Sequence, residues 1–452
     1  MTRVESPLSS ALPLPEPLAP RGRTAGWARY VPVTVLAAWS VVVTATDFDL
    51  DQVELTEISP RPGTVIQADN LGRFAHLVEH DFARFVAGGF ATLEVDEPLS
   101  FTPHAAFVTA TARFGTQTRL GASPGLLEEF VQGLPFPGKL AIDDPQAGQK
   151  TAWNMRYAYT GDSGLLPEIH WQLRDWRSEK VDVEMLFEAR SMRFMHRHVQ
   201  APVPFVDDNP QDAYAAFRLE AIDAGSYDGT EALVFANRDE SREVNGWVYI
   251  PQLGRTQSLA SFSTEESMFG SDILPTDFLV YSGRLTDMRW RYLGATFMLL
   301  PMYRHDRVQL SERKARKYDY WHVAFDGRAG CFPRVQWQLR PVLILEGTAV
   351  DDAALVRKRV FYIDAQTHVA PFWKVYRDGD ALWKFVITAY AHPNSHLPGN
   401  NESGAPLPTA FSTIDIQTNR CTTLQVLTLV NVDAVEAGDF DTADMQGRGR
   451  RR

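Results

Sequence analysis

The sequence predicts a mainly β protein of the α+β class, built around an antiparallel sheet. Alternating apolar and polar runs, an Asp-Gly turn between two such runs, and the lack of βαβ alternation or a fixed-period repeat favour this class. In residues 180–190 the apolar side chains share one face of the strand: Val181, Val183, Met185 and Phe187. A strand with one apolar face is typical of a half-buried antiparallel sheet.

The C-terminal half contains a series of consecutive strands. Residues 359–364, 371–377 and 381–390 are strand-like and follow one another with short connections. The last two are joined by Asp378-Gly379-Asp380, and Asp-Gly is a strong hairpin signal because glycine tolerates the positive φ of a tight turn. Further strand-like segments extend this predicted meander: residues 245–259, 288–300 and 335–347.

Few helices are predicted, and the clearest spans residues 69–86. Asp69 or Asn70 can cap its first turn. Its apolar residues fall within one stripe of an α-helix: Leu71, Phe74, Leu77, Val78, Phe82 and Phe85. On this helix His76, Glu79 and His80 would occupy the opposite, polar face.

The same segment contains HLVEH, which matches the H-x-x-E-H pattern of one class of zinc peptidases. His76 and His80 would hold the metal and Glu79 would activate water, so a zinc hydrolase is one functional alternative. A catalytic zinc also needs a third protein ligand and a shaped, water-poor cavity. Nothing in the sequence marks a third ligand. We therefore expect an ordinary amphipathic helix without a metal site.

Other catalytic signals are weak. The sequence has no G-x-S-x-G, no phosphate-binding glycine loop, no C-x-x-C and no H-E-x-x-H. Residues 161–166, GDSGLL, lack the spacing of a nucleophile elbow and predict a turn. His196 and His198 share one face of a predicted strand and could bind a metal, but a solvated or core-satisfied pair is the favoured interpretation. We predict no catalytic residue, no metal and no cofactor.

The net charge argues against a nucleic-acid partner. The formal charge is −11, and residues 1–45 hold four Arg and two Glu, so removing their net +2 leaves −13. Such a chain has no overall attraction for phosphate backbones. With 452 residues, 44% of them hydrophobic, it can bury a substantial core.

Residues 1–45 are predicted to be a signal peptide. Arg21, Arg23 and Arg29 precede the uncharged run 31–45, which ends in Val43-Thr44-Ala45 and suits signal peptidase. Fifteen helical residues reach about 22 Å, short of the roughly 30 Å hydrocarbon core of a membrane. Cleavage is therefore favoured over the alternative of an uncleaved anchor.

The chain has two cysteines, Cys331 and Cys421. In an exported protein they could form a disulfide, and closing a loop of that length would stabilise the fold by about 4 kcal/mol. The alternative is that both are ordinary small residues, and the two interpretations stay open.

Four dense segments resemble successive blocks of a known bacterial family. They are residues 133–162, 246–259, 269–294 and 358–384, the second reading GWVYIPQLGRTQSL and the last KRVFYIDAQTHVAPFWKVYRDGDALWK. In this order they are similar to the family called domain of unknown function 1329, over residues from about 50 to about 395. Residues 65–78, VIQADNLGRFAHLV, resemble the N-terminal segment of that family, so HLVEH is interpreted as part of a family helix.

This family is similar in fold to the periplasmic lipoprotein carriers LolA and LolB. The resemblance implies a curved, half-open antiparallel β-sheet or barrel whose concave apolar face is covered by a few helices. It also implies a periplasmic or outer-membrane-associated protein of a Gram-negative envelope. The implied role is a carrier for a lipid or another apolar ligand, working with an inner-membrane exporter of the resistance-nodulation-division type or an outer-membrane protein. Fold alone supplies no reaction.

A carrier of this kind would line its groove with aromatic residues, although each could equally be plain core. The candidates are Trp153, Trp247, Phe278, Tyr281, Trp290, Trp337, Phe361, Trp373 and Trp383. Asn154 could bind a ligand headgroup or satisfy a backbone group. The remaining polar candidates, which could form a charged cluster at the groove mouth or cap turns, are Asp272, Asp277 and Arg284.

The predicted organisation is a signal peptide over residues 1–45, one large β domain over 46–436 and a disordered basic tail over 437–452. The favoured function is a non-catalytic carrier. The alternatives are a scaffold within an envelope complex and a hydrolase.

Overall fold

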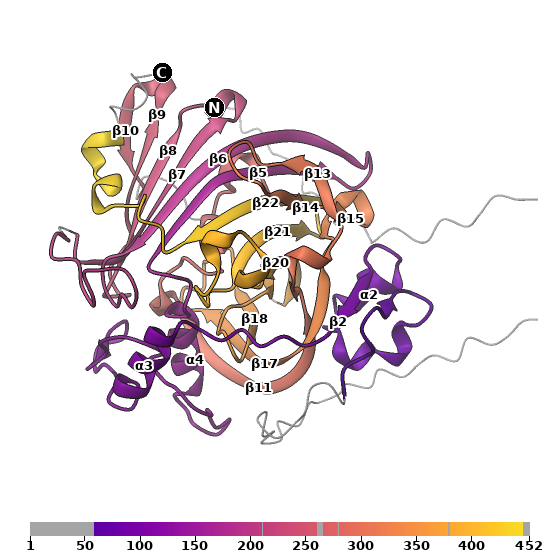
Figure 1. Cartoon of the computed structure of the whole chain (residues 1–452), viewed down its shortest axis with the longest axis horizontal. Helices are drawn as coiled ribbons and strands as arrows, with labels where there is room; N and C mark the ends of the chain where they lie inside the picture. Colours follow the sequence, from indigo (N-terminus) through magenta and orange to yellow (C-terminus); the bar gives the residue numbers. More distant parts are fainter. Residues whose placement is uncertain (1–57, 210, 260–264, 279, 378–379, 446–452) are drawn as a thin grey trace, which may run out of the picture. The chain divides into compact units, whose positions relative to one another are not determined.

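The computed structural model describes residues 58–209, 211–259, 265–278, 280–377 and 380–445. These residues form a 16-stranded sheet that curves strongly and does not close (Figure 1). The path of hydrogen-bonded strands runs from β1 at one end to β10 at the other. Strand β11 lies off this path and pairs with β17, near the end that holds β1. The prediction of a mainly β protein with a half-open sheet is therefore confirmed. The predicted signal peptide, residues 1–45, lies outside the described residues.

Neighbouring strands of the large sheet are antiparallel, except for the parallel pairs β2–β17 and β12–β20. In spatial order the main path contains β1 (Val65–Ile66), β2 (Leu93–Asp96), β17 (Gln336–Ala349), β18 (Lys358–Asp364), β19 (Phe372–Arg377), β20 (Ala381–Ala391), β21 (Leu407–Asp415), β22 (Arg420–Val430), β5 (Ser163–Asp175), β6 (Lys180–Arg193), β7 (Ala213–Asp223), β8 (Glu231–Asn237), β9 (Asn245–Ile250) and β10 (Arg255–Ser258). Off this path, β11 (Met288–Leu300) pairs with β17, and β12 (Met302–Tyr303) pairs with β20.

Short hairpins and a few helices accompany the sheet. The two-stranded sheets of the described residues are β3 (Arg119–Leu120) with β4 (Leu127–Glu128), β13 (Leu310–Lys314) with β14 (Trp321–Val323), and β15 (Phe325–Asp326) with β16 (Phe332–Pro333). The α-helices are α2 (Ala83–Ala87), α3 (Ala105–Phe114) and α4 (Ala147–Arg156). Across the described ranges, none of the helices has the length and apolarity needed to span a membrane.

The predicted strand segments of residues 180–190, 245–259, 288–300, 335–347, 359–364, 371–377 and 381–390 each contain a strand, whereas the predicted strand around His196 and His198 does not form. The hairpin predicted at the Asp-Gly turn is confirmed, because β19 and β20 pair antiparallel up to Arg377 opposite Ala381. In β6 the predicted apolar face is buried only from Met185 onward. Val181 and Val183 lie at its exposed end, with 39% and 44% of their surface accessible.

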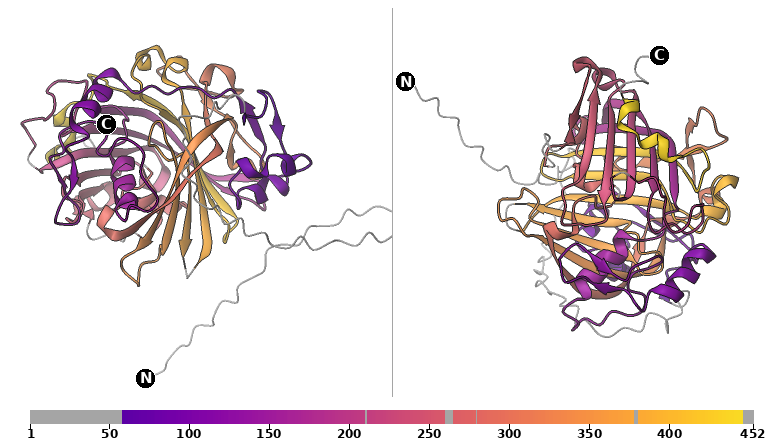
Figure 2. Two further views of the ribbon diagram at one scale, coloured as in Figure 1. Left: turned by 90° about the horizontal axis from the view of Figure 1, so that it is seen from below. Right: turned by 90° about the vertical axis from the view of Figure 1, so that its left-hand side faces the viewer.

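Strands β18 to β20 are buried on both faces, which explains their nearly continuous apolar sequences. In β19, Phe372 packs against Phe82 of the N-terminal segment. The next residue, Trp373, packs on the other face against Phe361 and belongs to the same core cluster as Trp153 of α4. In Figure 2 the α3–α4 region and the α2 region accordingly lie on opposite sides of these strands.

The predicted helix over residues 69–86 is wrong as a single element. The chain forms two 3-10 turns, η2 (Leu71–Arg73) and η3 (Ala75–Leu77), and an α-helix begins only at Ala83. Between them Val78 is extended, with φ −114° and ψ 137°. The segment follows tertiary contacts rather than the helical period, because the side chain of Glu79 turns into the protein.

These contacts also overturn the zinc-hydrolase interpretation of HLVEH. Glu79 is 7% exposed and accepts hydrogen bonds from Lys374 Nζ (2.7 Å) and Tyr362 Oη (2.9 Å). His76 and His80 are exposed. A carboxylate already paired inside the core and two imidazoles in solvent do not form one metal site.

The two cysteines form a disulfide, with Cα atoms 6.0 Å apart. Cys421 lies in β22 and Cys331 directly follows the 3-10 turn η11 (Arg328–Gly330). The open choice between a bridge and two free thiols is thereby decided.

The expected disordered tail is partly ordered. Residues 437–445 form the 3-10 turns η14 (Ala437–Phe440) and η15 (Thr442–Asp444). Phe440 and Met445 are 4% and 0% exposed and belong to one core cluster with Met192 and Phe194, at the end of strand β6. Two apolar side chains in a polar tail are enough to anchor it, and the remaining residues of the tail, 446–452, lie outside the described part.

Candidate functional site

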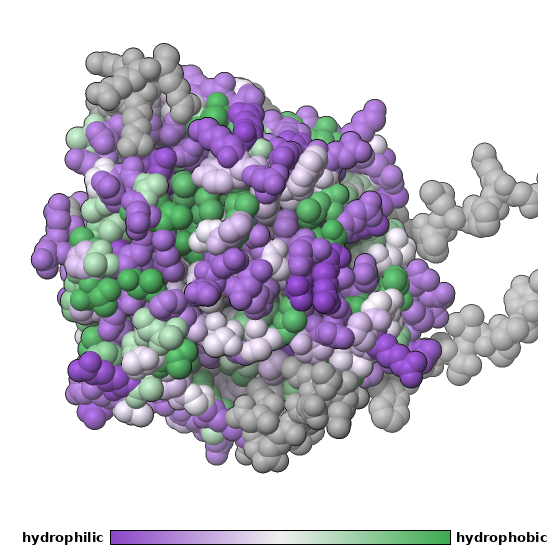
Figure 3. All heavy atoms as spheres, viewed as in Figure 1, coloured by the Kyte–Doolittle hydropathy of each residue, from purple (hydrophilic) through white to green (hydrophobic). Residues whose placement is uncertain are grey.

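An apolar groove of about 360 Å³ lies beside helix α3. Its lining residues are Pro103, Phe107, Val108, Thr111, Ala112, Thr116, Leu134, Pro137, Gln366 and His368. The volume falls within the roughly 300–1,000 Å³ of small-molecule sites. On the face of the molecule drawn in Figure 3, apolar areas form separate islands among polar ones.

Helix α3 supplies the first wall. Four of its residues share one face because they stand at positions i, i+1, i+4 and i+5: Phe107, Val108, Thr111 and Ala112. The helix starts at His104, whose Nδ1 accepts a hydrogen bond from the backbone N–H of Ala106 (3.1 Å). Phe107 is 6% exposed and Val108 is 48% exposed, so one lies in the core and the other at the surface.

The second wall is the segment from Gly133 to Pro137. Gly133 has φ +83°, and a Cβ there would lie 2.4 Å from the backbone nitrogen of Thr111, so only glycine allows this close approach. Thr111 Oγ1 accepts a hydrogen bond from the backbone N–H of Leu134 (2.8 Å). His198 Nε2 accepts one from Gly133 N–H (3.0 Å). The wall is therefore tied to the helix and to a distant loop.

Asn154 holds the same wall from helix α4. Its Oδ1 accepts from the backbone N–H of Phe136 (2.9 Å), and its Nδ2 donates to the carbonyl of Phe136 (2.8 Å). The side chain is 2% exposed. Of the two roles left open by the sequence, the contacts are those of a residue that satisfies a backbone group.

The third side of the groove is the turn between β18 and β19. Gln366 donates from Nε2 to Ser100 Oγ (2.9 Å) and accepts at Oε1 from the backbone N–H of Phe101 (2.8 Å). Burial lowers the pKa of His368 to about 4, against the opposing effect of Asp364. The imidazole is therefore neutral near pH 7, and the lining residues bring no charged side chain to the groove.

The structure brings six of the nine aromatic candidates together and separates the other three. Trp153, Tyr281, Trp290, Phe361, Trp373 and Trp383 meet in one core cluster with α4. Trp337 belongs to the cluster around Phe82, Phe278 packs with Phe217, and Trp247 packs with Phe235.

Helix α4 contributes Trp153 to this cluster and packs on the strands that carry its other members. It packs against β11 and β17 so closely that a Cβ on Gly148 would lie 2.4 Å from the carbonyl oxygen of Trp290. Trp153 and Trp373 are 1% and 0% exposed. Ligand binding by this cluster stays a prediction.

The predicted charged cluster of Asp272, Asp277 and Arg284 does not form. Arg284 binds Asp287 through two close contacts (3.0 and 2.7 Å). Asp277 is 0% exposed and pairs with Arg359, while Asp272 accepts from Thr422 Oγ1 (2.9 Å). The physical reason is that each buried carboxylate has its own fold partner, a cation for one and a hydroxyl for the other.

His196 and His198 also differ from their predicted arrangement. Neither lies in a strand, and His196 has φ +59°. His196 Nδ1 donates to the carbonyl of Val131 (2.7 Å), whereas His198 Nε2 accepts from Gly133. The two imidazoles bind separate backbone groups, one just before the groove wall and one at its first residue. They do not converge on a metal.

The segment GDSGLL holds the loop that contains these histidines. Asp162 accepts from the backbone N–H groups of His198 (2.9 Å), Val199 (2.5 Å) and Gln200 (2.9 Å). Burial alone would raise the pKa of Asp162, but these hydrogen bonds outweigh it and hold the pKa well below its usual range. The turn predicted for residues 161–166 is correct only for the first two residues, because strand β5 begins at Ser163.

The residues that line the groove were not among the site residues predicted from the sequence. Phe107 and Val108 lie in an alanine-rich segment whose apolar positions are compatible with a helix, which is the one local signal available. The contacts that complete the groove join α3 to residues 133–137 and 366–368, and no spacing in the sequence reports them.

The fold and the groove together define the class of the protein. It is an open, curved antiparallel β-sheet protein with a candidate binding site for an apolar ligand beside helix α3. The chain belongs to the DUF1329 family, described as a protein of unknown function, whose model matches residues 65–445. The resemblance inferred from the dense segments is thus confirmed. No curated protein matches the sequence.

Solved structures with low sequence identity are similar to this chain. A domain provisionally named as an outer membrane lipoprotein-sorting protein, from Vibrio parahaemolyticus, is 14% identical with a TM-score of 0.45, covering 67% of this chain and 100% of its own. A DUF1329 family protein from Desulfovibrio piger ATCC 29098 is 15% identical with a TM-score of 0.44, covering 67% and 99%. A LolA superfamily protein from Nitrosomonas europaea is 11% identical with a TM-score of 0.36, covering 66% and 98%.

Proposed function

We propose that this protein is a non-catalytic carrier that binds a lipid or another apolar molecule in the groove beside α3. The observation that supports the proposal is the lining: apolar side chains with neutral polar ones, on walls held by hydrogen bonds from Thr111, Asn154 and His198. Burying an acyl chain contributes roughly 0.8 kcal/mol per methylene. A site of this chemistry binds by apolar area and offers no charge to an ionic ligand.

We also propose that the carrier works in an oxidising compartment, on the periplasmic side of a Gram-negative envelope. The disulfide between Cys331 and Cys421 supports this location, because such bonds persist in exported proteins and are rare in reducing cytosol. The signal peptide predicted at residues 1–45 points the same way. An exporter or an outer-membrane protein is the partner that such a carrier would meet.

The cluster around Trp153 is a second candidate site of the same carrier. It would become accessible only if α4 moved away from β11 and β17, because the helix packs on these strands and Trp373 is buried. The groove beside α3 needs no such movement, so we place the ligand there first.

The test uses fluorescence titration with dodecanoic acid labelled with nitrobenzoxadiazole. Val108→Asp places a carboxylate in the groove lining, and we expect it to weaken binding at least tenfold because the charge must lose water when the chain enters. Val350→Asp is the matched control. Val350 is also 48% exposed but does not line the groove, so its variant should bind like the wild type.

Absence of binding to the wild-type protein would overturn the proposal. Equal binding by Val108→Asp and the wild type would remove the groove as the site. If Trp153→Ala, but not Val108→Asp, changed the affinity, the ligand would lie in the aromatic cluster.

A further inference from the structure

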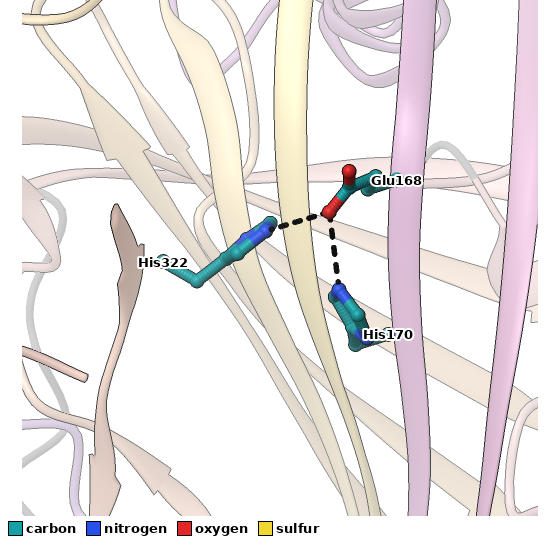
Figure 4. A group of neighbouring side chains, drawn as sticks. All are labelled: Glu168, His170 and His322. Carbon is teal, nitrogen blue, oxygen red and sulfur yellow. Dashed lines mark hydrogen bonds and ion pairs between the residues drawn. The ribbon is translucent and has the colours of Figure 1, made fainter. Parts of the chain in front are cut away.

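Glu168, His170 and His322 converge inside the protein, away from the groove. The first two lie on β5 and the third on β14, and Figure 4 shows both imidazoles directed at the same carboxylate. One donor atom from each side chain lies within 4.8 Å of the others. The residues are 4%, 6% and 0% exposed.

The spacing of the donor atoms suits a shared metal ion better than direct hydrogen bonds. Glu168 Oε2 lies 3.3 Å from His170 Nε2, which is a long hydrogen bond, and 3.5 Å from His322 Nε2, which is an ion-pair contact only. Charge-assisted hydrogen bonds to a carboxylate are shorter, about 2.7–2.9 Å. Two ligands of a tetrahedral zinc, with bonds of about 2.0–2.2 Å, lie about 3.3–3.6 Å apart.

The imidazole of His322 makes no hydrogen bond within the described residues. Neither Nδ1 nor Nε2 makes a hydrogen bond, although the ring is completely buried. Buried polar groups are almost always paired. An imidazole aimed at a carboxylate at 3.5 Å, with both nitrogens unsatisfied, is the second observation that points to a missing ligand.

Groups around the cluster orient its members. The backbone N–H of Arg316 donates to Glu168 Oε1 (2.6 Å), which leaves Oε2 for the histidines. His170 Nδ1 lies 2.7 Å from Arg313 Nη1 and 3.7 Å from Glu184 Oε1. Glu184 pairs with Arg313 at 2.5 Å, so a carboxylate compensates the guanidinium charge that lies beside His170.

Metal binding requires one local change. His170 Nε2 must offer its lone pair, so Nδ1 must carry the proton and donate it to Glu184 rather than accept from Arg313. Arg313 is bound to Glu184 at 2.5 Å and its side chain is 31% exposed, so it can turn away while keeping that pair. The result is the carboxylate–histidine–metal arrangement that holds many metal-binding imidazoles.

We propose that Glu168, His170 and His322 form a zinc site that fastens the β13–β14 hairpin to β5 of the large sheet. Two imidazoles and one carboxylate are a donor set that zinc accepts in tetrahedral geometry, with a fourth position left for water. The site joins residues 152 positions apart in the chain. It acts on the fold and is independent of ligand binding at the groove.

The test starts from protein purified without a histidine tag and freed of metal by chelator dialysis. After addition of zinc and removal of the excess, bound metal is measured by inductively coupled plasma mass spectrometry. We expect one zinc per chain. The same samples are digested with trypsin, because Arg316 and Lys317 are exposed between the strands of the hairpin and Lys314 is exposed at the end of β13, and zinc should slow cleavage there at least fivefold.

His322→Ala removes one ligand, and Glu168→Gln removes the charged ligand but keeps an acceptor for Arg316 N–H. Both should bind zinc at least tenfold more weakly and lose the protection from trypsin. The double variant His76→Ala/His80→Ala is the control for surface histidines and should bind like the wild type. Circular dichroism and titration of the fatty-acid probe verify that each variant is folded.

The proposal is overturned if the wild-type protein retains no zinc, or if Glu168→Gln and His322→Ala retain it as the wild type does. Loss of zinc only in the His76→Ala/His80→Ala variant would also overturn it and assign the metal to the surface. Because the probe reports the groove separately, none of these results bears on the carrier function.

Discussion

Several buried polar side chains of this protein bind backbone groups that lie far away in the sequence. Asn154 holds Phe136, and Asp162 holds three consecutive N–H groups from His198 onward. From the sequence, both residues could be described only as polar residues beside apolar segments, and their backbone partners could not be predicted. Their partners are 18 and 36 residues away. Asn154, a candidate for ligand binding, therefore holds a wall of the groove. Asp162, which lies in a predicted turn, holds the loop beside that wall.

His196 is the buried titratable residue with the clearest consequence for stability. Its ring is 4% exposed, its Nδ1 donates to Val131, and the aromatic rings of Phe130, Tyr157 and Phe205 surround it. Burial lowers its pKa to about 4, against the hydrogen bond to Val131, and the nearby charges of Arg193, His198 and Arg238 act in the same direction as burial.

We expect His196 to make the protein less stable as the pH falls. Between the unfolded pKa of 6.5 and the folded value of about 4, the unfolded chain binds a proton that the folded chain does not, so the free energy of unfolding falls as the pH decreases. From pH 7 to pH 5 this residue alone should account for about 2 kcal/mol. Urea unfolding at both pH values measures the effect.

His196→Asn removes the titrating group, keeps a donor for Val131 and tolerates φ +59°. Its free energy of unfolding should decline less between pH 7 and pH 5 than that of the wild type. His76→Asn, at an exposed position, should follow the wild type. Equal declines in all three proteins would contradict the expectation.

At the scale of the elements, α4 decides what the inner face of the sheet offers. A curved apolar sheet with a few helices can enclose an open groove or a filled core, and both arrangements satisfy the same strand pattern. Gly148 permits close contact with β11, and Trp153 then enters the cluster of Trp373 and Phe361. With this core filled, the groove beside α3 is an apolar site that is accessible without any movement of α4.

This arrangement predicts unequal effects of two tryptophan substitutions. Trp153→Ala should lower the free energy of unfolding by about 3–5 kcal/mol, because it leaves a large cavity in a packed cluster. Trp247→Ala, at a half-buried position near the sheet edge, should cost about 1–2 kcal/mol. Urea unfolding monitored by circular dichroism measures both. Similar losses would show that α4 is not firmly packed on the sheet.

At the scale of the whole molecule, the sheet joins segments that lie far apart in the described chain. β2 follows α2 near the N-terminal end, yet it pairs with β17, whose residues lie about 240 positions later. The disulfide adds a covalent link between segments separated by 90 residues. The covalent link lowers the entropy of the unfolded chain, whereas the closure of the β2–β17 pairing is an entropic cost of folding.

The disulfide should therefore contribute substantially to global stability. For a loop of this length the chain-entropy model gives about 4–5 kcal/mol, so Cys331→Ser/Cys421→Ser should unfold at markedly lower urea concentration than the wild type. Dithiothreitol should destabilise the wild type to a similar extent and leave the double variant unchanged. A wild-type protein insensitive to the reductant would show that the bond is not formed.

The sequence by itself determined the fold class, the family and part of the strand segments, because alternation, turn residues and ordered blocks are local properties of the chain. It did not determine the break of residues 69–86 at Val78, the inward turn of Glu79 or the packing of Phe440 and Met445 in the tail. Only the tertiary structure decided these, and only it brought α3 beside residues 133–137 and His322 beside Glu168. The physical reason is that burial and pairing depend on groups distant in the sequence, whose contacts outweigh local propensity once the sheet has formed.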